Sequence, residues 1–185
     1  MRRNRRRRGN AIVEVAIIWM PLVLLVFGIL DVTLVVFIRG MLQNATREAV
    51  RFAITYNNSY NGQTCTTHTG CIEIAVRDNS FGFLSGTVGG QPAANFIKVY
   101  FYAKDDLSTP LTQAQLPKTL PDGTVIQYLN QMGNLVEVRV ENYPWSWLVP
   151  LPSNYLQGTS MTMTVAASDI LQGYPVGLFA PPIGP

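Results

Sequence analysis

Residues 2–38 read RRNRRRRGNAIVEVAIIWMPLVLLVFGILDVTLVVFI, and this stretch governs the placement of everything after it. Six arginines lead to Gly9, and the segment that follows is almost entirely apolar, with Glu14 as its first charged residue. A run of about 18 or more mostly apolar residues predicts a membrane-spanning helix. Residues 11–38 measure about 42 Å as a helix, whereas the hydrocarbon core of a bilayer is about 30 Å thick. We therefore expect the helix to tilt or to continue outside the membrane.

The charges on the two sides of this segment predict its orientation. Positive charge close to a span holds that end in the cytoplasm. The arginine block directly precedes the span, whereas the other side carries only Arg39, Arg47 and Arg51 nearby. A cleavable secretory signal is the poorer explanation, because the apolar run is too long and residues 38–42 offer no small-x-small cleavage site. The sequence thus predicts a single span, with a cytoplasmic N-terminus and an exported C-terminal domain.

Glu14 is a carboxylate near the start of an apolar helix, where a charge is disfavoured unless it finds a partner. Cleavage of the chain after Gly9 would give Asn10 a free amine, and residues four apart on a helix are neighbours. That amine could neutralise Glu14 within one chain, or Glu14 of a neighbouring subunit, which would fix the axial register of assembly. An uncleaved anchor whose Glu14 side chain reaches the lipid headgroups explains the same residues.

The stretches RRGNAIVEVAIIWMPLVLLVFGILDV (residues 7–32) and NATREAVRFA (residues 44–53) carry a family resemblance. Gly9 followed by Glu14 on an apolar helix, behind a basic leader, is similar to the class III signal of type IV prepilins. More narrowly, the two stretches resemble the TadE-like minor pseudopilins of the tight-adherence (Flp) pilus system. The resemblance implies that a prepilin peptidase cuts between Gly9 and Asn10. It also implies that the helix assembles with other pilin or pseudopilin subunits on the pilus assembly platform, with Glu14 meeting a subunit's N-terminal amine.

Pro21 and Gly28 follow Glu14 at intervals of seven residues, so the three lie on one stripe of the helix. A glycine lets another backbone approach closely, as small residues do where membrane helices pack together. The stripe therefore favours packing of Pro21 and Gly28 against neighbouring helices. The alternative is that proline and glycine are simply commoner in membrane helices than in soluble ones.

Beyond the membrane, residues 39–56 are predicted to continue the helix as an exported spine helix. Apolar residues recur there at intervals of three and four, which is typical of one buried helix face. The apolar positions are Leu42, Ala45, Ala49, Val50, Ala53 and Ile54. The turn-forming residues 57–62 are expected to end the helix.

Cys65 and Cys71 are the only cysteines of the chain. An even count in an exported segment predicts a disulfide bond between them. A metal or redox site with His68 is the weaker alternative, because a metal needs more ligands than two sulfurs and one imidazole. His68 itself is expected in a small polar loop without an acidic partner.

The rest of the exported domain, residues 57–172, is predicted to form an antiparallel sheet. Apolar and polar residues alternate over residues 97–104, 136–141 and 161–165, and residues 124–129 are a candidate short strand. Residues 72–84 fit a strand and a helix equally well. Three or four strands over the spine helix bury one sheet face and the helix stripe together. We therefore expect an α+β, pilin-like fold.

Turn-rich connectors are predicted at residues 85–94, 105–123 and 143–158. The last connector contains Trp145 and Trp147 within a proline-bounded apolar stretch. Such a loop is either an exposed docking patch or a cap that folds back on the sheet edge. The tail, residues 173–185, is rich in proline and glycine and is expected to be poorly ordered.

The composition and motifs narrow the function classes. The leader, residues 1–9, holds six of the fourteen basic residues. The rest of the chain therefore carries eight basic and eleven acidic residues, and this acidic excess argues against nucleic-acid binding. No catalytic motif is recognisable, so we expect no enzyme, no cofactor, no metal and no small-molecule substrate. The sequence favours a minor pilin-like subunit with a cleaved leader, an assembly helix at residues 10–38 and the exported domain. The alternative is an uncleaved single-pass anchor that carries a periplasmic binding domain.

Overall fold

The computed structural model describes residues 4–57, 59–147 and 160–172, with side chains from Val13 onward except that of Ser160. The chain divides into two compact units. The first comprises residues 1–37 and 145–161, and the second comprises residues 38–144 and 162–185. Each unit is considered by itself below.

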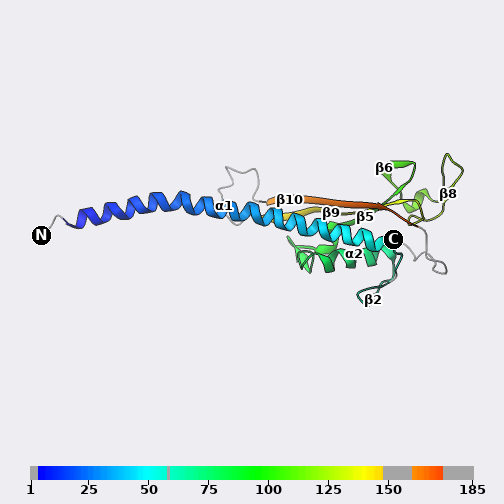
Figure 1. The fold of residues 1–185 in the computed structure, drawn as a ribbon, viewed down its shortest axis with the longest axis horizontal. Helices are drawn as coiled ribbons and strands as arrows, with labels where there is room; N and C mark the ends of the chain where they lie inside the picture. The colour runs from blue at the N-terminus through cyan, green and yellow to red at the C-terminus, as the bar shows by residue number, and fades with distance from the viewer. Residues whose placement is uncertain (1–3, 58, 148–159, 173–185) are drawn as a thin grey trace. The chain divides into compact units, whose positions relative to one another are not determined.

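Helix α1, Asn4–Ala53, is the long helix drawn from blue to cyan in Figure 1. It ends at Ala53, three residues before the end of the predicted spine helix at residue 56. Within the first unit, its large apolar side chains from Val13 to Leu30 are between 37% and 71% exposed. Among the described residues, this is the one helix long and apolar enough to cross a membrane. An apolar surface of this size needs lipid or other helices to cover it.

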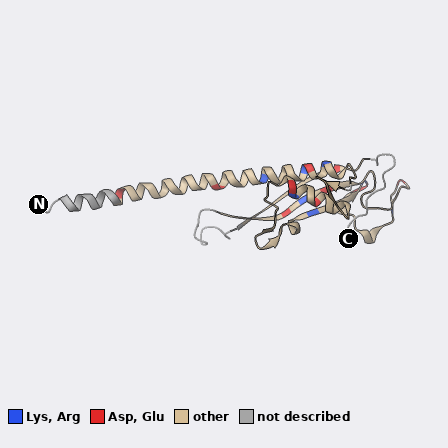
Figure 2. Cartoon of the chain, turned by 90° about the horizontal axis from the view of Figure 1, so that it is seen from below, with Lys and Arg blue, Asp and Glu red and all other residues tan. Residues whose placement is uncertain are grey.

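The second part of α1, residues 38–53, belongs to the second unit and buries one stripe. The buried side chains are 0–3% exposed and include Ile38, Leu42, Ala45, Ala49, Val50 and Ala53. Arg47, Glu48 and Arg51 are exposed on other faces, and Figure 2 shows acidic and basic residues gathered on this part of the helix. The predicted amphipathic spine helix is therefore confirmed. It ends where Tyr56 adopts a left-handed backbone conformation with φ of 54°.

The sheet of the second unit has four strands in the order β10-β9-β5-β6. These are β5 (Ile97–Ala103), β6 (Asp106–Pro110), β9 (Leu135–Ser146) and β10 (Ser160–Ile170). Strands β5 and β9 pair in antiparallel register, with Val99 opposite Val138. The inward side chains of β9 alternate with half-buried ones, and Val136, Val138 and Val140 are fully buried. The predicted period of two is thus confirmed for β9 and β10. Strand β5 departs from it at its end, where Phe101, Tyr102 and Ala103 are all buried.

Residues 38–53 of α1 lie along this sheet in both Figure 1 and Figure 2. The valines of β9 and the buried stripe of the helix share the core with Phe101, Met163 and Val165. This arrangement buries one face of each element together and confirms the α+β class.

Helix α2, His68–Asn79, settles the segment that fitted both a strand and a helix. The hydroxyl of Thr67 caps its first turn by accepting a hydrogen bond from the N–H of Gly70 at 3.1 Å. Cys71, Ile72, Ala75 and Val76 form its buried face at helical spacing. His68 opens this helix and is buried, so its predicted place in a polar loop was wrong.

Three short hairpins complete the second unit. They are β1 (Ser59–Tyr60) with β2 (Gln63–Thr64), β3 (Thr87–Val88) with β4 (Gln91–Pro92), and β7 (Lys118–Thr119) with β8 (Val125–Ile126). Two 3-10 turns, η1 (Ala93–Phe96) and η2 (Gln113–Gln115), lie between them. The predicted strand at residues 124–129 is therefore only two residues long. The predicted connector 105–123 instead holds β6, η2 and β7, because Leu111 and Leu120 join Ala103 and Ile126 in a small second core.

Candidate functional site

Glu14 lies on the exposed apolar part of α1. The predicted cleavage bond between Gly9 and Asn10 also lies within α1, although the side chains there are outside the described set. In a helix, the backbone of residue 10 and the side chain of residue 14 are one turn apart. Cleavage after Gly9 would therefore create a helix N-terminus beside this carboxylate, and negative charge near a helix N-terminus is stabilising.

Pro21 and Gly28, the predicted packing residues, lie on the same exposed part of α1. Pro21 is exposed, and apart from Gly28 itself, its two chain neighbours and the adjacent backbone of α1, no described atom lies within 4 Å of the place where a Cβ on Gly28 would sit. The surface at Gly28 is consequently open to the backbone of another helix. Packing there stays a prediction, because a single chain shows only one side of such a contact.

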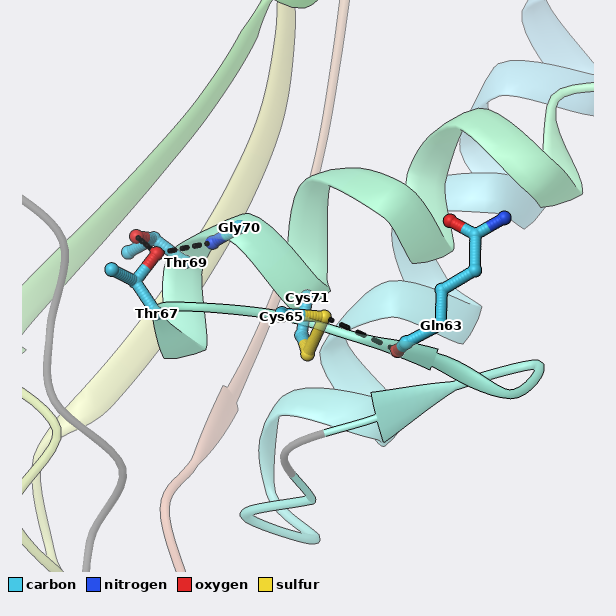
Figure 3. Close-up of a disulfide and its surroundings, with 6 residues drawn as sticks. All are labelled: Gln63, Cys65, Thr67, Thr69, Gly70 and Cys71. Atoms are coloured by element: carbon cyan, nitrogen blue, oxygen red, sulfur yellow. Dashed lines mark hydrogen bonds between the residues drawn. A yellow bond between two sulfur atoms is a disulfide. The ribbon is translucent and has the colours of Figure 1, made fainter.

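The disulfide bond between Cys65 and Cys71 is present, with the two Cα atoms 5.3 Å apart (Figure 3). It ties the strand end after β2 to the buried face of α2. Among the described residues, no group of three or more His, Cys, Asp or Glu side chains is placed to hold a metal ion. The bond confirms the predicted pairing and closes the chain over the start of α2.

His68 has a structural role that the sequence did not reveal. Its Nε2–H donates to the carbonyl of Ala53, the last residue of α1, at 3.0 Å. Its ring stacks on Tyr56 with centroids 5.6 Å apart and an interplanar angle of 17°, and the Tyr56 hydroxyl donates to the carbonyl of Asn130 at 3.1 Å. Burial lowers the pKa of His68, and the hydrogen bond to Ala53 only partly opposes this. A neutral His68 therefore fastens the start of α2 to the end of the spine helix.

A signal for this role was present in the sequence. His68, Cys71, Ile72 and Ala75 follow the spacing i, i+3, i+4 and i+7 that marks one helix face. Reading residues 68–79 as a helix would have placed the imidazole on the buried face.

Trp145 and Trp147 were predicted in a loop over residues 143–158, and this boundary was wrong. Strand β9 continues to Ser146, so Trp145 lies on the strand. Asn142 has a positive φ of 55°, and the buried side changes there from Val140 to Tyr143. An extra residue of this kind lets a strand continue with its alternation shifted. Residues 148–158 of the predicted docking loop lie outside the described residues.

Arg139 is the centre of the polar outer face of the sheet. Its guanidinium lies 2.7 Å from a Glu137 carboxylate oxygen and 3.6 Å from one of Glu141, and it sits 5.1 Å from the centre of the Tyr100 ring. Burial disfavours the charged form of Glu137, but hydrogen bonds from Arg139 and Tyr102 outweigh it and lower its pKa. The two carboxylates are therefore paired with Arg139 in a partly buried ionic cluster.

The chain thus combines a long exposed helix, which carries Glu14 near its start, with a disulfide-bonded domain. The family model for TadE-like proteins matches residues 9–51. The matched TadE-like segment begins at Gly9, contains Glu14 and extends to the exposed Arg51 on the spine helix. It confirms the resemblance seen in the sequence over these residues, which make up less than a quarter of the chain. Neither the curated proteins nor the solved structures gave a significant match.

Removing the disulfide is expected to destabilise the second unit without preventing its folding. For a loop this short, loss of the cross-link lowers the free energy of unfolding by about 2 kcal/mol through the entropy of the unfolded chain. The measurement is urea denaturation of the full-length protein in detergent, comparing wild type with Cys65→Ser/Cys71→Ala. The wild type under a reducing agent serves as the matched control and should shift by a similar amount. Identical midpoints for all three samples would contradict a stabilising role.

Proposed function

We propose that this protein is a processed, minor pilin-like subunit of a Tad pilus apparatus. A prepilin peptidase removes residues 1–9, and the mature chain starts at Asn10. The helix then packs with the helices of other pilin or pseudopilin subunits on the assembly platform. Glu14 pairs with the N-terminal amine of a subunit and fixes the axial register.

The observation that carries this proposal is the position of Glu14. The carboxylate lies near the start of an exposed apolar helical surface. A charge at the centre of a span costs about 2.5–3.5 kcal/mol, and one near the start costs less but is still disfavoured without a partner. The residues around it offer no described cation, and the first basic side chain after it is Arg39. An amine created at Asn10 lies one helical turn away and supplies the missing positive charge. The TadE-like match begins at the residue that precedes this amine.

The exported domain supports the proposed orientation. Six arginines before the span favour a cytoplasmic N-terminus. The disulfide on the other side of the apolar segment is of the kind that persists in oxidising compartments such as the periplasm. Both features favour an inner-membrane subunit whose α+β domain faces away from the cytoplasm.

The mature N-terminus tests the proposal. In the native host we expect intact-mass spectrometry to show a chain that begins at Asn10, because the peptidase recognises Gly9 ahead of the apolar helix. Gly9→Leu should leave the chain beginning at Met1, and Arg8→Lys should not change the processing. A wild-type chain that keeps its leader, recovered from cells with an active peptidase, would indicate the uncleaved anchored binding domain instead.

A further inference from the structure

We propose that Asp31 marks the outer limit of the lipid-contacting surface of α1 and holds residues 31–37 outside the hydrocarbon of the bilayer. The acyl chains then cover α1 from about residue 11 to Leu30, which is shorter than the predicted assembly helix at residues 10–38. This inference depends on insertion of α1 into a membrane but not on cleavage after Gly9. It applies equally to a processed subunit and to an uncleaved anchor.

The exposure of α1 changes at Asp31. Every described side chain from Val13 to Phe27 is exposed, and so are those of Ile29 and Leu30. Asp31, by contrast, is only 2% exposed. The residues of α1 up to Phe37 that are described and not exposed follow one another at intervals of three and four, so they share one face of the helix. They are Gly28, Asp31, Leu34 and Val35. Because a helix does not cover its own surface, other protein covers this face around and beyond Asp31.

The exposed apolar stretch before Asp31 matches the thickness of a bilayer. Residues 11–30 measure about 30 Å as a helix, which is the thickness of the hydrocarbon core. Glu14 is the one charged residue among them, and Figure 2 shows the described part of this stretch almost entirely in tan, the colour of uncharged residues. A span that continued to Ile38 would be about 12 Å longer, and the helix would have to tilt or the bilayer to thicken.

The carboxylate of Asp31 opposes deeper insertion. If the hydrocarbon ended at Ile38, Asp31 would lie seven residues inside it, at a depth of about 10 Å. An acidic side chain at that depth is disfavoured, which is why charged residues are rare within membrane spans. If the hydrocarbon ends at Leu30, Asp31 lies at the level of the polar headgroups and the charge meets no such penalty.

The first unit also contains strand backbone, which belongs outside the hydrocarbon. Besides α1 up to residue 37 it comprises residues 145–161, and these include the end of β9 and the start of β10. Lipid-exposed backbone that is neither helical nor part of a closed barrel does not occur in the hydrocarbon region. Trp145 and Trp147 of this unit are half-buried, and tryptophan is enriched where membrane meets water. This composition favours a position at the membrane surface for the covered part of α1.

Exposed apolar side chains continue beyond Asp31, so composition alone would extend the span to Ile38. Val32 and Val36 are 58% and 65% exposed. Val36 lies about 9 Å beyond Leu30 along the helix, whereas the headgroup region adds about 5–8 Å on each side of the hydrocarbon core. Val36 therefore reaches water if the hydrocarbon ends at Leu30, and it contacts acyl chains if the hydrocarbon ends at Ile38. This position separates the two boundaries.

Cysteine labelling of the full-length chain tests the boundary, with one uncut chain in each nanodisc of phosphatidylethanolamine and phosphatidylglycerol. Because each disc holds a single chain, protection of an exposed position reports contact with lipid. Val26→Cys and Val36→Cys both replace exposed side chains of α1. A membrane-impermeant maleimide should label the second at least about tenfold faster, since a thiol in hydrocarbon rarely ionises. The native cysteines are joined in the disulfide and do not react.

A second substitution tests the role of the carboxylate. Asp31→Leu should draw residues 31–37 into the bilayer and slow the labelling of Val36→Cys about tenfold, because it removes the charge that opposes insertion. Thr33→Val is the matched control on the same turn of α1. It also makes the helix more apolar but removes no charge, so the labelling rate should stay the same. Circular dichroism and an intact disulfide verify that each variant is folded.

Three results would overturn the inference. Slow labelling of both Val26→Cys and Val36→Cys would place the boundary at Ile38, and fast labelling of both would place it before residue 26. Unchanged labelling of Val36→Cys in the Asp31→Leu chain would show that the carboxylate does not set the depth of the helix. The chain in the discs meets no peptidase, so these results are independent of processing. A leader that stays uncleaved in the native host would defeat the proposed processing and leave this boundary standing.

Discussion

Replacing Glu14 by glutamine is expected to leave membrane insertion and cleavage after Gly9 intact while abolishing incorporation of the chain into filaments. The substitution removes a charge from an apolar surface, so insertion should if anything become easier. It leaves the leader and Gly9 unchanged, so the peptidase still meets its substrate. The amine of Asn10 then lacks its carboxylate, and an unpaired ammonium group in an apolar helix bundle opposes packing.

The filament fraction sheared from cells, probed for this subunit and compared with the membrane fraction, measures the effect. Glu48→Gln is the matched control, because Glu48 is also an exposed glutamate on α1 but lies on the spine helix. Glu14→Asp should recover part of the incorporation, since it keeps the charge on a shorter side chain. Normal incorporation of Glu14→Gln would rule out the register role and leave the glutamate as an interfacial residue.

The parts of the fold that follow from local periodicity could be predicted from the sequence. Helix α1 and its buried stripe repeat at three and four residues, and the valines of β9 repeat at two, so each element carries its own signal. Residues 72–76 carry both periods, because Ile72, Ile74 and Val76 alternate while Ile72, Ala75 and Val76 share a helix face. The Thr67 cap decides for the helix, and that cap depends on one hydroxyl rather than on a pattern.

The parts that depend on distant partners could not be predicted in the same way. His68 binds a carbonyl fifteen residues earlier in the chain, at a helix end whose position was known only approximately. The hairpins β3–β4 and β7–β8 have two-residue strands, which are too short to show a period. Because the alternation shifts at Asn142, strand β9 continues past Pro144, which had been expected to lie in a loop.

The partner of Glu14 could not be observed for a different reason. Glu14 could be singled out from the sequence because a charge in an apolar run is conspicuous. Its proposed partner is an amine that exists only after cleavage and, in the filament, belongs to another subunit. Neither the sequence nor the structure of one uncut chain contains that contact, so the pairing rests on the chemistry of its two halves.

Replacing His68 by alanine is expected to lower the free energy of unfolding of the second unit by about 3 kcal/mol. A cost of this size is typical of removing a large buried ring together with a buried hydrogen bond. The ring is fully buried, stacks on Tyr56 and satisfies the Ala53 carbonyl, one of the groups left without a partner at the end of α1. Urea denaturation of the full-length protein in detergent at pH 7.5 measures the loss. His68→Gln keeps an N–H donor of comparable reach and should lose less. Equal stability of wild type and His68→Ala would show that the link between α1 and α2 is not needed.

The same histidine is expected to make the domain less stable in mild acid. Burial lowers the pKa of His68 in the folded chain, whereas the unfolded chain keeps a histidine pKa of about 6.5. Above about pH 6.5 both states are neutral and the histidine adds no pH dependence. Below it, the unfolded state binds a proton that the folded state refuses, so the free energy of unfolding falls by up to about 1.4 kcal/mol per pH unit until the folded pKa is reached. His68→Gln cannot titrate, so its stability should fall less steeply between pH 6.5 and the folded pKa. Parallel curves for the two proteins would show that folding does not lower the pKa of His68.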